Sequence, residues 1–348
     1  MPDLHPLFAG VVAMHGAIRD ALIAATARQP LHTLASVQRD DEGDTSYAID
    51  TTAEDVTRSW VEALAVTHSF TFIAEGMPDE QPTGRNGVAG GSIEPGLTTS
   101  AHDSTREWRI IHDPIDGTRG LMYQKRSAWI LTGVAPNRGA ATSLADIVFA
   151  VQTEIPLPKQ NLSDQIWAVA GEGVAARRHN HDTGMDTPLH LRPSSAATIA
   201  HGFATISRFF PGARDELAAI DEEIVSGALG PVQPGKAHCF EDQYISTGGQ
   251  LYELLAGHDR FIADLRPLAE RTLARRGLKL GICCHPYDIC TALIARESGV
   301  ILTDADGRSL HAPLDLASDV AWAGYANRQI REQIEPLLQA ALRKRGWI

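Results

Sequence analysis

A short polar turn that directly follows an apolar run is the feature that most constrains the fold of this chain. Residues 108 to 112 (WRIIH) predict a buried strand, which runs into Asp113-Pro114-Ile115-Asp116-Gly117-Thr118. Such a turn can aim two carboxylates and one backbone carbonyl at a single point, which suits the oxygen coordination of Mg²⁺. The Gly-Thr pair can present backbone N–H groups to a phosphate. The hexapeptide therefore predicts a site for metal and phosphate at the end of a strand.

Two other interpretations of the hexapeptide compete with this one. Asp, Pro and Gly all favour turns, so the segment could form an ordinary polar turn without a ligand. A HAD-type phosphatase also has an Asp followed by Asp-Gly-Thr, but such enzymes need an Asp-x-Asp spacing. Two residues separate Asp113 from Asp116 here, and this spacing disfavours that class.

The rest of the first half predicts helices packed on an antiparallel sheet. Residues 5 to 28 have apolar positions at helical spacing, and a second helix is expected from Thr51, which forms a capping-box pattern with Glu54. Residues 70 to 74 predict a short strand. Residues 81 to 105 are rich in Gly, Ser, Thr and Pro and predict a long loop. Further strands are expected at residues 128–134 and 145–152.

A polar stretch at residues 177 to 195 predicts the boundary between two parts of the chain. We expect an α+β half over residues 1–192 and an α/β half over residues 193–348. Strands and helices alternate in the second half, which indicates mixed strand order. The strands are expected at residues 199–206, 261–263 and 300–302, and the helices at residues 214–224, 246–255, 286–298 and from Asn327.

The composition excludes some classes of partner. The formal net charge of −12 argues against binding to nucleic acid and to anionic membranes, because phosphate polyanions repel an acidic surface. The chain has no uninterrupted apolar run of about 18 residues, and its first residues lack the basic patch of a secretory signal. We therefore expect a cytoplasmic protein that binds neither nucleic acid nor membranes.

The cysteines leave two interpretations open. Cys239, Cys283, Cys284 and Cys290 are too few in 348 residues for a disulfide framework, so we expect reduced thiols. Zinc binding by the last three together with His285 is one alternative, although their spacing matches no CxxC pair. Packing in the core is the favoured interpretation.

Two further acids stand near the expected ends of secondary structure. Glu75 follows a strand, and Asp288 stands in the helix-opening segment HPYD. Taken alone, each is an ordinary strand-end or capping residue. Together with Asp113 and Asp116 they would form a cluster of acids, which is costly to bury without cations.

The segments that contain Glu75, Asp113 to Thr118 and Asp288, taken in their order along the chain, resemble the inositol monophosphatase family. That family has an FIGE-like strand, then DPIDGT, then a helix-opening WD and a downstream Glu-Ala-Gly. This chain has Phe72-Ile73-Ala74-Glu75, the intact hexapeptide, Tyr287-Asp288 and Glu297-Ser298-Gly299. Weaker matches are Asp50 and residues 170–175 (AGEGVA) and 246–249 (STGG). Together they cover most of the chain.

The resemblance implies a layered αβαβα sandwich of the inositol monophosphatase and fructose bisphosphatase type, assembled as a homodimer. It also implies two or three Mg²⁺ ions in each site. One would be held by Glu75, Asp113 and the Ile115 carbonyl, and a second by Asp113, Asp116 and Asp288. A third would lie weakly bound near Glu75.

The implied reaction is hydrolysis of a phosphomonoester by a metal-activated water, with no phospho-enzyme intermediate. Thr118, supported by Asp50, would orient or deprotonate this water beside Glu75. Substrate contacts are implied for Gly117, Thr118, Arg119 and Gly248.

Departures from the family pattern leave the substrate open. Gly76 stands where the family has a second acid, residues 119–121 (RGL) replace Thr-Asn-Phe, and Tyr287 replaces Trp. Residues 81–105 and 264–281 are longer than in a minimal member and could reshape the pocket.

We expect a small phosphorylated metabolite, such as an inositol monophosphate-like polyol or a sugar phosphate. Alternatives on the same fold are 3′(2′),5′-bisphosphate nucleotidase, fructose-1,6-bisphosphatase and histidinol-phosphatase activities. Arg119, next to the phosphate-binding turn, would favour a second phosphate or a carboxylate on the substrate. A non-catalytic sensor of a phosphorylated ligand and a structural protein are the alternatives from other classes.

Overall fold

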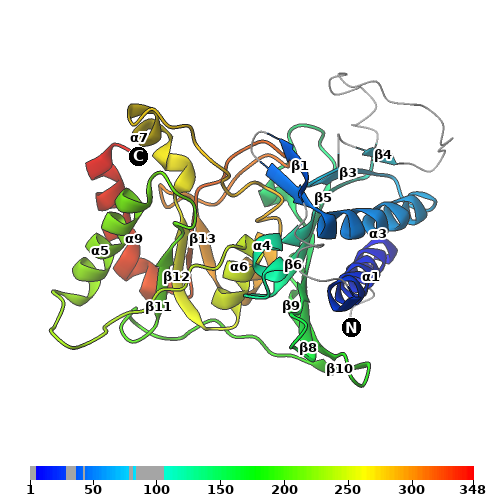
Figure 1. Cartoon of the computed structure of the whole chain (residues 1–348), viewed down its shortest axis with the longest axis horizontal. Helices are drawn as coiled ribbons and strands as arrows, with labels where there is room; N and C mark the ends of the chain where they lie inside the picture. The colour runs from blue at the N-terminus through cyan, green and yellow to red at the C-terminus, as the bar shows by residue number, and fades with distance from the viewer. Residues whose placement is uncertain (1–4, 29–36, 42–43, 78–80, 84–105) are drawn as a thin grey trace.

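The chain folds into alternating layers of helices and sheets (Figure 1). The computed structural model describes residues 5–28, 37–41, 44–77, 81–83 and 106–348. Helices α1 (Pro6–Arg28) and α3 (Ala48–Ala65) cover the outer face of one sheet, and α5 (Arg214–Leu229) and α9 (Arg328–Arg345) cover the outer face of another. Helices α6 (Thr247–Leu255) and α8 (Ala292–Ser298) lie between the two sheets.

Eight of the described strands form the first sheet, in the order β10-β9-β8-β7-β6-β5-β3-β4. Neighbouring strands are antiparallel except β3 and β5, which are parallel, so the expectation of a purely antiparallel sheet is wrong at this pair. The strands are β3 (Phe70–Ala74), β4 (Gln81–Thr83), β5 (Trp108–Asp116), β6 (Ala128–Pro136), β7 (Phe149–Ile155), β8 (Leu162–Val169), β9 (Gly173–Asn180) and β10 (Met185–Pro188).

The second sheet has the predicted mixed strand order, β11-β12-β14-β13 among the described residues. Strands β11 (Phe203–Ile206) and β12 (Asp259–Asp264) are parallel, whereas β14 (Trp322–Tyr325) is antiparallel to both β12 and β13 (Ile301–Thr303). The smaller elements are the hairpin β1 (Val37–Asp41) and β2 (Asp44–Tyr47), helices α4 (Thr118–Met122) and α7 (Glu270–Arg275), and 3₁₀ turns at Leu144–Asp146 and Arg266–Ala269.

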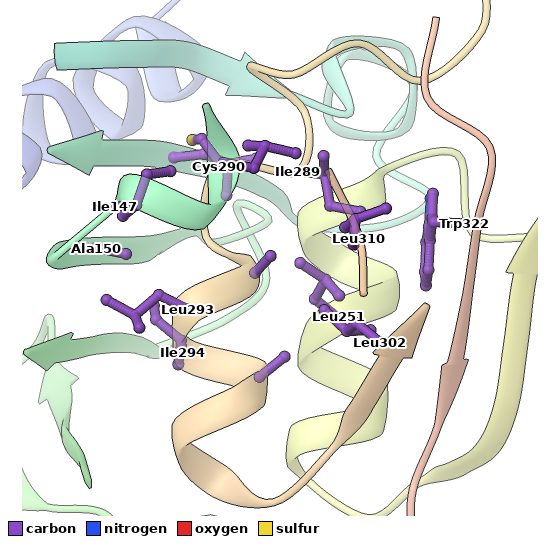
Figure 2. Close-up of a cluster of buried hydrophobic side chains, with 14 of the residues drawn as sticks. Ile147, Ala150, Leu251, Ile289, Cys290, Leu293, Ile294, Leu302, Leu310 and Trp322 are labelled. Atoms are coloured by element: carbon purple, nitrogen blue, oxygen red, sulfur yellow. The ribbon is translucent and has the colours of Figure 1, made fainter. Parts of the chain in front are cut away.

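The central core joins the two sheets through α6 and α8. Figure 2 shows Leu293 and Ile294 of α8 next to Ile147 and Ala150 on the side of the first sheet. Leu251 of α6, Leu302 and Trp322 fill the side toward the second sheet. Because these side chains are almost fully buried, the core fixes how the two sheets face each other.

Helix α1 is long and apolar enough to cross a membrane, judged by length and composition alone. Its buried side chains, which include Leu7, Met14 and Ile18, belong to the cluster under the first sheet. They pack there with residues of α3 and β7. In this structure the apolar face of α1 therefore serves as core.

Two helices begin elsewhere than predicted, each because an aspartate bonds to the backbone. Helix α3 begins at Ala48 rather than Thr51, and the carboxylate of Asp50 accepts the Tyr47 N–H at 2.7 Å. Helix α8 begins at Ala292 rather than at residue 286. The Asp288 carboxylate accepts the His285 N–H at 2.6 Å, which holds the preceding residues in a turn.

Three loop or strand predictions also need correction. The polar residues 177–195 contain the second half of β9 and all of β10, which form an antiparallel hairpin at the edge of the first sheet. The strand expected at 145–152 begins only at Phe149, after a 3₁₀ turn. Of the loop expected at 81–105, the first three residues form β4, and residues 84–105 lie outside the described residues.

Candidate active site

Asp113 and Asp116 converge because strand β5 contains an extra residue between them. Asp113 pairs with Leu131 of β6 and Asp116 pairs with Trp129, so a step of three residues on β5 matches a step of two on β6. In a regular strand, residues three apart point to opposite faces. The bulge adds one residue and thereby returns both carboxylates to the same side.

Asp288 brings a third carboxylate to these two from the turn before α8. Ligand oxygens of Asp113, Asp116 and Asp288 all lie within 4.8 Å of one another. Asp113 is completely buried and Asp116 nearly so, while Asp288 is partly exposed. The fold thus assembles an acidic cluster from residues that are far apart in the sequence.

Burial and mutual repulsion make this cluster unfavourable without a cation. Burial, together with the charges of Glu75, Asp116 and Asp288, raises the pKa of Asp113 well above its usual value. Burial and the charge of Asp288 raise the pKa of Asp116 to about 8, against the opposing effect of hydrogen bonds from Gly248 and Ser246. These carboxyl groups hold protons tightly in the absence of a metal.

The donor set fits a hard divalent cation. Asp113 Oδ1 accepts the Ile115 N–H at 2.9 Å, whereas the buried Oδ2 has no hydrogen-bond partner. A buried carboxylate oxygen without a donor is costly, and a divalent cation would satisfy it. All three nearby ligands are carboxylates, the donors that Mg²⁺ and similar cations prefer.

The alternative zinc site does not form among the described residues. Cys283, Cys284 and Cys290 are buried free thiols that belong to no cluster of metal ligands. Burial raises the pKa of the Cys283 thiol to about 12, and it raises the pKa of the other two as well. Neutral thiols of this kind act as small apolar side chains, which agrees with the packing role favoured for the cysteines from the sequence.

The parallel pairing of β3 and β5 places Glu75 beside Asp113. Ala74 is in register with His112, and the next residue, Glu75, donates its N–H to the His112 carbonyl at 3.2 Å. Parallel strands end at the same edge of a sheet, so Glu75 lines the same pocket as the three aspartates. It is not one of the three acids within 4.8 Å of one another.

Thr118 joins the hexapeptide to helix α3. Its Oγ1 donates toward the Ile115 carbonyl at 2.9 Å and toward Asp50 Oδ1 at 3.1 Å. The other Asp50 oxygen accepts the Tyr47 N–H at the start of the helix. Asp50 therefore both caps the helix and contacts Thr118.

Gly117 needs its special backbone geometry. Its φ of +97° is in the left-handed region, and a Cβ there would lie 3.0 Å from the Ser246 Cβ.

The Gly248 N–H donates to Asp116 Oδ2 at 2.5 Å, and Ser246 Oγ donates to the same oxygen at 2.9 Å. Gly248 thus contacts Asp116 but does not line the pocket, whereas Ser246 and Thr247 do.

Aromatic rings and guanidinium groups form another part of the pocket wall. Arg119 lies 5.9 Å from the centre of the Tyr47 ring and 5.9 Å from that of Phe210. Arg266 lies over Phe209 at 4.5 Å, but its charge is matched by the buried Asp264. Arg119 makes no ion pair with any described carboxylate, so it is the cation of this pocket that remains available to a ligand.

Several residues that line the pocket were not predicted from the sequence. Glu54 was assigned to a helix cap, yet it lies four residues after Asp50 and so on the same helix face, a spacing that could have revealed it. Tyr47, Phe209 and Phe210 carry no motif that marks them. Their positions in the pocket depend on contacts between segments that are far apart in the sequence.

Comparison with known proteins shows similarity in structure alone. No family model matches the chain, and no curated protein sequence matches it. The extragenic suppressor protein SuhB of Bartonella henselae superposes with a TM-score of 0.64 at 14% identity, over 96% of this chain and 99% of that one.

Two further solved structures are similar over nearly their whole length. Fructose-1,6-bisphosphatase of Leishmania major has a TM-score of 0.64 at 13% identity, over 96% of this chain and 93% of that one. An IMPase of Thermotoga maritima has a TM-score of 0.59 at 14% identity, over 96% and 97%. The chain has the fold that these proteins share, which confirms the predicted αβαβα sandwich.

Proposed function

We propose that this chain is a Mg²⁺-dependent phosphomonoesterase that acts on a small phosphorylated metabolite. The observation that carries this proposal is the convergence of Asp113, Asp116 and Asp288 within 4.8 Å beside the Gly117-Thr118 turn. The fold that the chain shares with solved structures of a fructose-1,6-bisphosphatase and an IMPase supports it. Two or three ions per site, as the motif resemblance implies, are part of the proposal.

Bound Mg²⁺ would offset the charge of the phosphate and lower the pKa of the attacking water. The three aspartates, together with Glu75, would hold the ions and thereby fix the geometry of the reacting groups. The hydroxyl of Thr118 directs its proton toward Asp50 and the Ile115 carbonyl, so its oxygen lone pairs remain to accept a hydrogen bond from the water. The N–H groups of Gly117 and Thr118 bind phosphate oxygens at the start of α4.

A substrate with a second anionic group is the favoured version of this proposal. Arg119 is held between Tyr47 and Phe210 and carries a charge that no described carboxylate pairs. A second phosphate or a carboxylate on the leaving group would match this cation. A bisphosphate or phosphorylated acid therefore fits the pocket better than a neutral polyol phosphate.

The test is a phosphate-release screen over monophosphates of polyols and sugars, phosphorylated carboxylic acids and bisphosphates. Each compound is assayed with Mg²⁺ and after removal of divalent cations. We expect release that needs Mg²⁺ and that is abolished by Asp116→Asn. Tight binding of a phosphorylated compound without any release would instead identify a sensor, and the absence of both would rule out the proposal. Homodimer formation and a cytoplasmic location stay predictions of the sequence.

A further inference from the structure

We propose that Glu54 supplies an additional carboxylate to the metal-binding end of this pocket, in the space that Gly76 leaves open. The inference rests on the proposed function, because it assigns Glu54 to the same divalent-cation site. Gly76 follows Glu75 and has a φ of +72°. A Cβ at this position would lie 2.7 Å from Glu54 Oε1. The carboxylate of Glu54 therefore occupies the place where a side chain of residue 76 would begin.

Helix α3 places the side chain of Glu54 next to Gly76. Asp50, one turn earlier, contacts Thr118 at 3.1 Å, and Thr57, nearly one turn later, lies 3.4 Å from the ring of His112. Residues at this spacing share one helix face. Asp55 is exposed to solvent on another face, while Glu54 is partly buried and lines the pocket.

The unsatisfied oxygen of Asp113, which lines the same pocket as Glu54, indicates that a cation belongs in this pocket. Asp113 is fully buried, and its Oδ2 faces no hydrogen-bond donor. The carboxylates that line this pocket are Asp50, Glu54, Glu75, Asp113, Asp116 and Asp288. The charge of Arg266 is matched by Asp264, so among the described lining residues Arg119 alone offsets these six carboxylates. Each additional carboxylate in this pocket increases the electrostatic repulsion among the acids, unless divalent cations are bound between them.

Glu54 and Glu75 line one pocket from two different elements, a helix and the end of a strand. The three converging aspartates form the more buried part of the site. We therefore assign Glu54, with Glu75, to the more weakly held cation, either directly or through a water in its coordination shell. The space next to Glu75 is thus filled by a carboxylate even though position 76 has no side chain.

The first experiment measures metal binding without any substrate. Mg²⁺ and Mn²⁺ are titrated calorimetrically into metal-free wild type, Glu54→Gln and the control Asp55→Asn. We expect Glu54→Gln to bind the weaker class of ion about tenfold less tightly, in the range typical for residues that support a metal site. Asp55→Asn should bind like the wild type. The thermal midpoint of the metal-free Glu54→Gln protein, measured alongside, checks that the variant folds.

The second experiment moves the carboxylate. Gly76→Asp alone would place its Cβ against Glu54 and should weaken metal binding. In the Glu54→Ala background the same change has room, and it should recover part of the lost affinity despite the positive φ. A merely structural Glu54 would show no such dependence of one substitution on the other.

Unchanged binding of every ion by Glu54→Gln would overturn the inference, and so would a loss of metal-free stability with no change in affinity. The outcome is separable from that of the proposed function. Weaker metal binding by Glu54→Gln in a protein that releases no phosphate would sustain the role of Glu54 and reject the phosphatase. A wild-type protein that binds no divalent cation would reject both.

Discussion

The hydroxyl of Thr118 lies 3.1 Å from Asp50 Oδ1, although the two residues are 68 positions apart in the chain. The second oxygen of Asp50 is held by the Tyr47 N–H, so both oxygens of this carboxylate are fixed. Thr118 is also tied to the carbonyl of Ile115. The orientation of the Thr118 hydroxyl therefore depends on the helix as well as on the hexapeptide.

Removal of this hydroxyl should impair the reaction more than the binding of metal. We expect Thr118→Val to lower kcat about 100-fold or more, the size typical of a lost proton-transfer or positioning group. The affinity for Mg²⁺ should change little, because the three converging aspartates remain. Steady-state kinetics and calorimetric titration measure the two quantities. Thr118→Ser keeps the hydroxyl and should retain most of kcat; an equal loss in both variants would contradict a role for the hydroxyl.

Asp116→Asn should weaken metal binding while the protein stays folded. The asparagine oxygen can still accept hydrogen bonds from Ser246 and Gly248, but the negative charge is gone. We expect Mg²⁺-dependent phosphate release to fall by about 100-fold or more, as for the loss of a major electrostatic group. Circular dichroism and the thermal midpoint of the metal-free variant check the fold. Activity near that of the wild type would contradict the assignment.

The metal-free protein should lose stability as the pH rises from about 6.5 to 8. In this range the unfolded chain has released the protons of Asp113 and Asp116, while the folded chain keeps them because burial raises both pKa values. The folded state then binds more protons, so the free energy of unfolding falls by about 1.4 kcal/mol per pH unit for each proton retained. Urea unfolding at several pH values after removal of divalent cations measures this slope.

Two comparisons separate this effect from other titrations. Asp116→Asn should make the slope shallower, and saturating Mg²⁺ should do so in the wild type by replacing the protons. Below pH 6.5 the slope should flatten, because burial lowers the pKa of His15 and of His112, the latter to about 3. The protons that only the unfolded chain takes up on these histidines then offset those that only the folded chain keeps on the two aspartates. A flat profile between pH 6.5 and 8 would show that the carboxyl groups are already ionised in the folded protein.

Arg119 should discriminate between substrates. We expect Arg119→Ala to raise KM about tenfold or more for a bisphosphate or a phosphorylated acid, since a charge-assisted hydrogen bond contributes about 1.5–3 kcal/mol. For a neutral polyol phosphate KM should change much less. Kinetics on both kinds of substrate measure the ratio. The exposed Lys125 lies outside the pocket, and Lys125→Ala serves as the control for net charge; equal effects on both substrates would reject this subsite.

Glu297 should matter for stability but not for the metal site. Its two carboxylate oxygens accept the N–H groups of Gly171 and Gly173 at 2.9 Å and 3.0 Å, which ties α8 to the turn between β8 and β9. We expect Glu297→Ala to lower the free energy of unfolding by about 1–2 kcal/mol. Denaturant unfolding measures the change, with the exposed neighbour Glu172→Ala as the control. A change in the affinity for Mg²⁺ would contradict a purely structural role.

Local signals in the sequence were strong enough to predict the ends of several elements. The apolar spacing of α1 and the buried run of β3 are visible in single segments, and the cap of α9 at Asn327 is as well. Strand β5 was predicted to end at His112, before a turn, but it continues through the bulge to Asp116. Helix α3 was predicted to begin too late because Thr51 and Glu54 imitate a capping box, while Asp50 bonds to the Tyr47 N–H instead. The hairpin of β9 and β10 was missed because edge strands carry many polar side chains.

The site could be predicted only where a motif marks it. The aspartates of the hexapeptide stand in a recognisable segment, and Asp288 followed from the order of the motifs. The contribution of Glu54 could not be read from local patterns, because it depends on the empty space at Gly76. The contacts of Arg119 with Tyr47 and Phe210 depend in turn on loops that meet only in the folded chain.

The bulge between Asp113 and Asp116 also decides which mutations this segment can tolerate. Replacing Ile115 by another apolar residue leaves the count of residues unchanged, so both carboxylates stay on one side. Deleting it would restore a regular match of two residues on β5 to two on β6, and would bring the second aspartate next to proline in the chain. The two aspartates would then be two residues apart and would still point to one face of the strand. What the deletion removes is the Ile115 carbonyl, to which the Thr118 hydroxyl donates at 2.9 Å.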